Sequence, residues 1–483
     1  MNGGLLTLDW AIIAMALGVL LAIAWFAGRD QKDTEDFFLA KRKIPVWAAT
    51  FSFVATEISA MTIVGVPAVG FSENWQYLQF FIGSAAARIL IGYFFIPSFY
   101  KYGTVTIYEF LGKRFGVSTQ YCSSAFFFIT RLFASGVRLY AASLAVSVIM
   151  GWPLIYAIIF FSVISVFFIG FGGIRAVVWT GIWEAFAFYL AGAMMFYAIF
   201  NASGFSLSEF LSAAIENNKL SVINWGFNFS DPNIFLIAIL NGVFGSMAAF
   251  GTDQELMQRL LTLNTRRESQ KSIILTIFAT LPLVTLYLAV GTAIFVYYKA
   301  HPGAPLPDNS DKILSHFALN FFPAGFKGIF LAAVILASID SPLSSLTSSF
   351  ITDIYRPLSG ENNEARLMKI SRASIVAFGV ILACVALLCQ NIEGMLWLAF
   401  KINGLTAGSL LGIFLLGIFT SRSGDRGNVT AMITAFVVCL ATMILSEKKI
   451  IAVGWSWFIV IGTVCTFLLA FLLSSKQAQA ENN

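Results

Sequence analysis

The sequence predicts an all-α polytopic membrane protein, and its composition, its hydropathy and the length of its apolar runs each support this fold class. Hydrophobic residues make up 58% of the 483 positions and charged residues only 11%, whereas soluble domains are roughly half apolar and a quarter charged. The mean hydropathy is +0.81. Apolar runs of about 20 residues, the length that spans a bilayer as a helix, recur along the whole chain. The lipid bilayer is therefore the expected environment.

About 13 transmembrane helices are expected from these runs. The first run has no basic segment before it and no small-residue cleavage site after it, which predicts a retained helix and not a signal peptide. The predicted spans cover residues 7–27, 46–70, 76–99, 119–149, 153–171, 176–200, 232–256, 271–298, 316–352, 368–388, 394–420, 427–446 and 450–474.

The distribution of Lys and Arg predicts the orientation of the chain. About 20 of the 30 Lys and Arg residues fall in alternate loops on one side of the predicted membrane, and loops rich in these residues face the cytoplasm. We therefore expect a multi-pass protein of the plasma (inner) membrane, with its amino terminus outside and its carboxyl terminus in the cytoplasm. Because the net charge of +5 follows from this topology, it gives no reason to expect nucleic acid as a partner.

Two of the predicted spans contain polar residues and glycines that interrupt the apolar pattern. In the second and seventh spans the interrupting residues are Thr56, Glu57, Ser59, Gly65 and Pro67, and Asn241, Gly242, Gly245 and Gly251. Interruptions that lie five helices apart predict two inverted five-helix repeats with a central binding site, because unwound backbone inside a membrane needs an ion, water or substrate as its partner. The alternative for the glycines is close helix packing.

Four motifs in this order resemble those of the sodium/solute symporter family: "TIYEFLGKRFG" (106–116), "GGIRAVVWTGIWE" (172–184), "GTDQELMQRLL" (251–261) and "DIYRPL" (353–358). The resemblance covers nearly the whole chain, and it implies a leucine-transporter-type fold. The expected organisation is an extra helix and loop in 1–45, the first inverted repeat in 46–210, the second in 211–425, and two extra helices with a polar tail in 426–483.

The resemblance implies Na+ as the coupling ion and places its primary site. Counting back from "DIY" without gaps puts the family's hydroxyl cluster on residues 337–341. The site would then use Ser338 Oγ and the backbone carbonyls of Ala55, Ile58 and Val334. Ala337 departs from the family pattern and removes one hydroxyl ligand.

A second sodium site of some family members falls on Asp340 and Ser341. The family supplies its anion from "WTD", but this chain reads "WTG", with Gly181 at the acidic position. Since a buried cation needs negative charge from either facing helix, Asp340 is expected to replace the missing acid, assisted by Glu184. Anchoring the alignment at the other end of the helix would instead assign these roles to Ser341, Ser344 and Ser345.

Polar and aromatic side chains within the spans are candidate substrate contacts. Arg131 and Arg138 are seven residues apart and share a helical face, so they either hold a substrate carboxylate or only neutralise Glu57, Glu184 and Asp340. Glu57 either contacts substrate or pairs with an arginine, and Arg88 has no expected role. The remaining candidate contacts are Ser59, Thr62, Tyr77, Gln79, Phe81 and Lys401.

The function expected from these features is a sodium-coupled symporter that imports a small polar organic solute by alternating access. Buried Arg and Lys favour a carboxylated sugar such as a sialic acid, or another organic acid, whereas Glu57 would suit a neutral sugar or polyol. A transporter-like sensor or a channel is a further alternative, and an enzyme is not expected. The expected partners are the solute, sodium ions and the lipid bilayer, and a monomer is expected.

Overall fold

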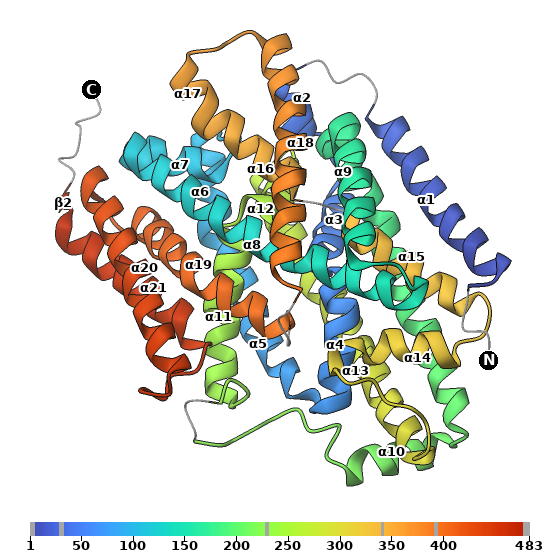
Figure 1. Ribbon diagram of the computed structural model, residues 1–483. Helices are drawn as coiled ribbons and strands as arrows, with labels where there is room; N and C mark the ends of the chain where they lie inside the picture. The colour runs from blue at the N-terminus through green and yellow to red at the C-terminus, as the bar shows by residue number, and fades with distance from the viewer. Residues whose placement is uncertain (1–4, 29–32, 228–230, 340–341, 391–394, 477–483) are drawn as a thin grey trace.

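The computed structural model describes residues 5–28, 33–227, 231–339, 342–390 and 395–476, and it is mostly helical (82%). Figure 1 shows the helices packed side by side, with one short antiparallel pair of strands, β1 (Arg422–Ser423) and β2 (Ser475–Lys476). The helices are α1 (Thr7–Ala27), α2 (Thr34–Leu39), η1 (Ala40–Arg42), α3 (Val46–Glu57), α4 (Ala60–Ser72), η2 (Trp75–Tyr77), α5 (Leu78–Leu90), η3 (Ile91–Phe95), α6 (Ile96–Tyr102), α7 (Ile107–Phe115), α8 (Val117–Met150), α9 (Leu154–Ser203), α10 (Leu207–Glu216), α11 (Phe235–Gly251), α12 (Gln254–Leu261), α13 (Arg266–Ala300), η4 (Ser310–Lys312), α14 (Ile313–Phe321), α15 (Phe326–Ile339), α16 (Leu343–Ser349), η5 (Phe350–Tyr355), α17 (Arg356–Ser359), α18 (Glu364–Leu388), α19 (Met395–Phe419), α20 (Asp425–Glu447) and α21 (Trp457–Leu473).

The helices reproduce the predicted spans in number and order. Among the described residues, 9 helices are long and apolar enough to cross a membrane, or up to 11 with the bent pairs counted as one span each. Two shorter apolar helices match the remaining predictions. One is Leu154–Gly170, the part of α9 before its kink at Gly173, and the other is Trp457–Leu473. The ninth span was predicted to begin at residue 316, but that region forms the separate helix α14, and the span begins at Phe326 after Pro323 has ended the preceding segment.

Two spans are broken, and some of the predicted interrupting residues lie at or beside the breaks while others lie inside the helices. Helices α3 and α4 meet at an angle of 60°, and α11 and α12 meet at 63°. The first break is at Ile58 and Ser59, because Gly65 and Pro67 are accommodated inside α4. The second is at Thr252 and Asp253. The prediction of paired interruptions is therefore confirmed. Of the four residues predicted to interrupt the second span, Gly251 directly precedes the break, whereas Asn241, Gly242 and Gly245 lie inside α11.

Glycines allow backbone contact where the broken spans cross their neighbours. A Cβ atom on Gly242 of α11 would lie 2.2 Å from the carbonyl oxygen of Phe80 and 3.0 Å from Cα of Gly83 on α5. A Cβ atom on Gly291 of α13 would lie 2.2 Å from the carbonyl oxygen of Pro67 on α4. Small residues at such crossings let helices approach closely in a membrane. The packing alternative is therefore the correct interpretation for Gly242.

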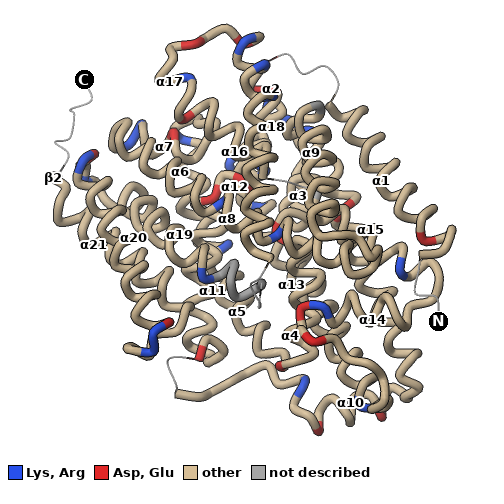
Figure 2. Tube along the Cα trace, in the orientation of Figure 1, with Lys and Arg blue, Asp and Glu red and all other residues tan. Residues whose placement is uncertain are grey.

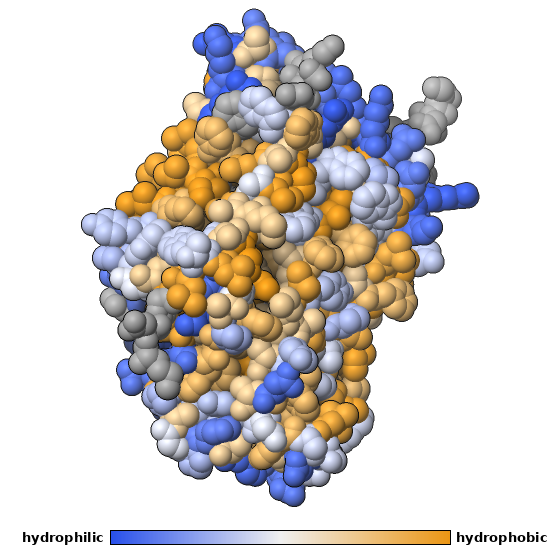
Figure 3. Space-filling view, turned by 90° about the vertical axis from the view of Figure 1, so that its right-hand side faces the viewer, coloured by the Kyte–Doolittle hydropathy of each residue, from blue (hydrophilic) through white to orange (hydrophobic). Residues whose placement is uncertain are grey.

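Charged residues gather at the two ends of the helix bundle, as Figure 2 shows for the end that carries α2, α7 and α17. We call this the α7 end. In Figure 3 an apolar belt separates the hydrophilic ends. This distribution is what a protein surrounded by hydrocarbon requires, because a charge at the bilayer centre costs about 3 kcal/mol or more.

A left-handed turn connects α2 with the region before α3. Ala40, Lys41 and Arg42 have φ angles of 49°, 49° and 53°, a conformation that side chains with a Cβ atom disfavour. Tertiary contacts hold the turn in place. Arg42 donates to the carbonyl oxygen of Thr104 at 3.0 Å, and Gln258 of α12 donates to the carbonyl oxygen of Phe38, just before the turn, at 2.8 Å. The turn is therefore tied to α12.

A lysine from the loop after α10 caps the end of α4 that is remote from the break. Lys219 Nζ donates to the carbonyl oxygens of Phe71 at 2.5 Å and Glu73 at 2.8 Å, and it lies 4.2 Å from the ring centroid of Phe295. Burial lowers the pKa of Lys219, and the nearby Glu73 partly opposes that shift. A cation at a helix carboxyl terminus is favourable because it complements the helix dipole.

Candidate functional site

A cavity of about 160 Å³ lies between the two broken spans. Its walls come from the α3–α4 break, η2, α5, α8, the α11–α12 break, α13, α19 and the segment before α21. We call it the central cavity. Most of the predicted substrate contacts line it: Glu57, Ser59, Thr62, Tyr77, Phe81, Arg131 and Arg138.

Glu57 is held by two partners that sequence reasoning did not identify. Arg88 of α5, which had no expected role, donates to Glu57 Oε1 at 2.5 Å, and Thr280 of α13 donates to Oε2 at 2.7 Å. Arg88 is 1% exposed. Of the two alternatives for Glu57, an arginine pair and a substrate contact, the structure shows the pair, and Glu57 is also among the residues that line the central cavity.

Arg131 pairs with two carboxylates at the second break. Its NH2 group contacts Asp253, the residue that caps α12, and its NH1 group contacts Glu255 in the first turn of α12. The expectation that Arg131 neutralises Glu57, Glu184 or Asp340 is therefore wrong for the described residues. Both of its terminal nitrogens are engaged, so Arg131 ties α8 to α12 at the base of the central cavity.

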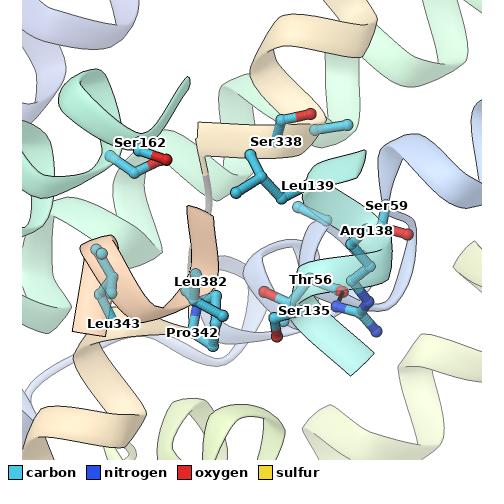
Figure 4. A pocket seen from close by; sticks show the side chains of 14 residues that line it. Thr56, Ser59, Ser135, Arg138, Leu139, Ser162, Ser338, Pro342, Leu343 and Leu382 are labelled. Carbon is cyan, nitrogen blue, oxygen red and sulfur yellow. Dashed lines mark hydrogen bonds between the residues drawn. The ribbon is translucent and has the colours of Figure 1, made fainter. Parts of the chain in front are cut away.

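Arg138 lies where the central cavity meets a second, smaller one. Its NH1 group is 3.4 Å from the carbonyl oxygen of Thr56, near the end of α3. Figure 4 shows Arg138, Leu139 and Ser135 projecting from the same helix, α8, across from Ser162 and Ser338. Arg138 and Ser59 line both cavities, so a ligand in the central cavity and an ion in the smaller cavity would share these neighbours.

The smaller cavity, of about 40 Å³, is lined by part of the predicted sodium site. Ala55, Ala337 and Ser338 line it, and Ser338 Oγ donates to the carbonyl oxygen of Val334 at 2.7 Å. Ile58 lies on the central-cavity side of the break. Because α3 ends at Glu57, its last carbonyls lack partners within the helix. Carbonyl and hydroxyl oxygens are the ligands that hard cations prefer, so this donor set fits sodium.

The proposed second sodium site is only partly visible. Asp340 and Ser341 lie outside the described residues. Glu184 is completely buried in α9, and Gly181 of the same helix is in tight contact with α3, because a Cβ atom there would lie 2.9 Å from Cα of Ser52. An acid at position 181 would therefore require α3 and α9 to move apart.

The alternative register gives different surroundings for its serines. Ser344 and Ser345 are both buried on α16, and Ser345 Oγ donates to the carbonyl oxygen of Pro342 at 2.9 Å. Neither serine lines the smaller cavity, whereas Ser338 does. Among the described serines of the two registers, Ser338 is therefore the one that shares the smaller cavity with the end of α3.

Two predicted substrate contacts are wrong. Lys401 does not line the central cavity, because its Nζ atom pairs with Glu447 of α20 at 2.7 Å. Gln79 is 0% exposed, and it fastens the loop before α11 by donating to the carbonyl oxygen of Asn233 at 2.7 Å and accepting from the amide of Asn224 at 3.0 Å. Both side chains therefore have structural partners.

Three of the four motifs identified in the sequence meet near the α7 end of the central cavity. Thr106 donates to Asp353 Oδ1 at 2.6 Å, and Gln254 accepts from the amide of Ile107 at 3.0 Å. These bonds join residues more than 140 positions apart in the chain. Hydrogen bonds therefore join three of the four motifs to one another at this end.

Several cavity residues were missed by the sequence analysis. Asn403 of α19 and Trp455, which precedes α21, both line the central cavity, as does Asp253 at the second break. The motif around Asp253 had been noted without a binding role. Nothing in the local sequence marks Trp455 as a cavity residue. It was also missed because the last two helices were expected to lie outside the site.

Comparisons with known proteins agree with this architecture. A model of the sodium:solute symporter family matches residues 37–435. The chain is 27% identical over 475 residues to a sodium/sialic acid symporter of Aliivibrio fischeri, covering 96% of this chain and 92% of that protein. It is 28% identical over 476 residues to a sodium/glucose cotransporter of Vibrio parahaemolyticus, covering 92% and 87%.

Solved structures show the same fold. A sodium-coupled sialic acid symporter in a substrate-bound outward-open state superposes with a TM-score of 0.88 at 24% identity, covering 97% of this chain and 99% of that one. The nucleobase-cation-symport transporter Mhp1, in a closed conformation, superposes with a TM-score of 0.56 at 15% identity, covering 92% and 96%. The expected leucine-transporter-type fold is thereby confirmed.

Proposed function

The chain belongs to the sodium:solute symporter family, and we propose that its solute is a carboxylated sugar such as a sialic acid, or another organic acid. The protein is a multi-pass membrane transporter, and sodium is its coupling ion. With a membrane potential of about 100 mV and a tenfold gradient, each sodium ion supplies about 3.7 kcal/mol, enough for several-hundred-fold accumulation.

Arg138 is the observation that carries the choice of an acidic solute. Arg131 has both terminal nitrogens engaged by carboxylates, and Lys401 is turned away from the cavity. Arg138 lies beside Ser59 on the walls of both the central and the smaller cavity, and its NH1 group is 3.4 Å from the carbonyl oxygen of Thr56. A guanidinium group can bind a carboxylate through two parallel hydrogen bonds. We therefore assign the substrate carboxylate to Arg138, with Ser59 and Thr62 beside it.

Uptake into proteoliposomes tests this proposal. The protein is reconstituted with an inward sodium gradient and offered radiolabelled sialic acid, lactate, pantothenate, proline, glucose, galactose and inositol. Accumulation of a carboxylated solute above its external concentration, abolished when choline replaces sodium, is the expected result. A strong preference for a solute without a carboxylate would contradict the proposal.

Replacing Arg138 by glutamine should lower uptake of the carboxylated solute at least tenfold, mainly through a higher KM. The physical reason is that a charge-assisted hydrogen bond contributes about 1.5–3 kcal/mol. Arg138→Lys keeps the charge without the two-pronged geometry, so it should recover part of the loss. Unchanged KM in well-folded Arg138→Gln protein would assign the carboxylate to another group.

Replacing Ser338 by alanine should raise the sodium concentration for half-maximal uptake at least several-fold, because it removes the hydroxyl that the primary sodium site is proposed to use. The amount of folded protein should be unchanged, since the side chain makes its one described hydrogen bond within its own helix. Ser345→Ala, on the buried face of α16, is the matched control. A sodium dependence that changes only in Ser345→Ala would favour the alternative register.

A neutral sugar or polyol is the second candidate solute. It is supported by the position of Glu57 in the wall of the central cavity, since its carboxylate accepts two hydrogen bonds and has lone pairs for more, and by the similarity to a sodium/glucose cotransporter. The same uptake panel decides between the two. Concentrative uptake would also exclude a channel, and solute transport without chemical change would exclude an enzyme.

We further propose that the α7 end faces the cytoplasm, because loops rich in Lys and Arg lie there. The amino terminus would then be outside and the carboxyl terminus inside. We propose that the two inverted repeats are residues 46–210 and 211–425, because the two broken spans lie five helices apart. We also propose that the protein is a monomer.

A further inference from the structure

Arg88 occupies a position that neither the motifs nor the cavity lining explains. It is a fully buried cation on α5, it does not line the central cavity among the described residues, and its partner Glu57 is the last residue of α3. We propose that Arg88 is a positioning residue for the primary sodium site. It would act through Glu57 on the unwound segment that carries the ion's carbonyl ligands. This inference rests on the proposed location of the sodium site.

The location of Glu57 creates a problem that Arg88 solves. A helix carboxyl terminus carries a partial negative charge, and an acidic residue there is unfavourable. The next residue, Ile58, is extended, with ψ at 103°, so the chain leaves the helix directly after the carboxylate. A buried guanidinium at 2.5 Å offsets both the carboxylate and the end of the helix. Without it, a carboxylate at this place would be expelled towards water.

The carboxylate of Glu57 is fixed from two further helices. Arg88 holds one oxygen from α5 and Thr280 holds the other from α13. Since both oxygens are held, the side chain cannot rotate without losing a hydrogen bond. The neighbouring carbonyls of Ala55 and Ile58, two residues before and one after, therefore keep their directions.

Arg88 also connects the two broken spans. Its guanidinium lies 4.7 Å from the ring centroid of Phe250, two residues before the second break. The ring of Phe250 in turn packs edge-on against Phe53 of α3 at 5.4 Å. Helix α5 packs against α11 at the Gly242 crossing, and α13 packs against both α3 and α5. The contacts of Arg88 with Glu57 and Phe250 can therefore fix the shape of the sodium site without closing or opening the cavity.

If Arg88 positions the primary sodium site, removing its ion pair with Glu57 should weaken sodium binding. In a variant with both Glu57→Gln and Arg88→Gln, charge balance and approximate shape are kept, while the charge-assisted bond is lost. The sodium concentration that gives half of the sodium-dependent thermal stabilisation should rise at least fivefold. Arg88→Lys keeps the cation and one donor, so its value should stay within about twofold of wild type.

The measurement is the Tm of the purified full-length protein without solute, titrated with sodium chloride against choline chloride at constant ionic strength. A ligand that binds only the folded state raises Tm as its concentration exceeds its Kd. The double variant Lys401→Gln with Glu447→Gln removes an ion pair of the same kind at the surface. It is the matched control and should leave the sodium midpoint unchanged.

The possible results distinguish an error in the role of Arg88 from an error in the location of the sodium site. If wild type shows no sodium stabilisation, or Ser338→Ala leaves it unchanged, the proposed sodium site is wrong. If both behave as expected and the Glu57/Arg88 double variant keeps the wild-type midpoint, the role of Arg88 is overturned, whatever happens to its Tm without sodium. If the double variant does not fold, Thr280→Val serves instead. It should raise the midpoint two- to fivefold, and an unchanged midpoint would overturn the inference.

Discussion

Replacing Arg131 by glutamine is expected to abolish concentrative uptake and to open the central cavity at the α7 end. The substitution leaves Asp253 and Glu255 buried without their cation, and breaking a buried ion pair in this way costs about 3–5 kcal/mol. Because Arg131 joins α8 to the start of α12, the cost is relieved when these helices separate. The same movement uncovers the base of the cavity.

Labelling of a cysteine at a cavity position measures this opening. Ala249→Cys places a thiol on the central cavity, and a membrane-impermeant thiol reagent is applied to each side of the vesicles, with the parent protein correcting for its 5 native cysteines. Labelling from the α7 side should increase in Arg131→Gln. Arg131→Lys, which can reach only one carboxylate at a time, should lie between. Wild-type uptake and labelling in Arg131→Gln would refute the closing role.

Replacing Gly242 by valine is expected to prevent accumulation of folded protein. The first added carbon already lies 2.2 Å from a backbone oxygen of α5, and backbone cannot yield as a flexible side chain can. The helices α5 and α11 would have to separate along their crossing. Inserting atoms into packed cores commonly costs about 1–3 kcal/mol even where side chains can move, so the effect here should be larger.

Gly245→Val is the matched control, one turn further along the same helix. Its nearest neighbour for an added Cβ is a side-chain oxygen of Asn241 at 3.5 Å, and the position lines the central cavity. This variant should fold and be purified in normal yield, with solute uptake impaired by the smaller cavity. Size-exclusion chromatography of detergent extracts compares the two. Equal yields would show that the crossing at Gly242 tolerates side chains.

The helices were predictable because hydrocarbon imposes a simple rule: each span must be apolar for about 20 residues and must satisfy its own backbone hydrogen bonds. The same rule located both broken spans. Within them it marked Ser59 at the first break and Gly251 beside the second, but it also marked glycines that lie inside helices, because glycine has two uses. In α11 the glycine at 242 serves helix packing, and the chain unwinds ten residues later, at Thr252 and Asp253.

The site was predictable to the extent that it depends on a helical face. Arg131 and Arg138 share a face and both reach the central cavity. Ion-pair partners depend on which helices become neighbours, so the pairing of Arg88 with Glu57 could not be inferred from residues 31 positions apart. For the same reason Lys401 was assigned to the cavity although the neighbouring α20 offers it Glu447. The correct helix was identified, but Asn403 is the residue that faces inward.

The left-handed turn at Ala40–Arg42 stores backbone strain. Each such residue costs about 1–2 kcal/mol relative to right-handed backbone, and the turn persists because Arg42 and the Gln258–Phe38 bond restrain it. Gln258 belongs to α12, the same segment that Arg131 holds through Asp253 and Glu255. Movement of α12 away from α2 would release one restraint and let the turn relax. The elastic energy stored beside α3 would then assist opening at the α7 end and resist closure.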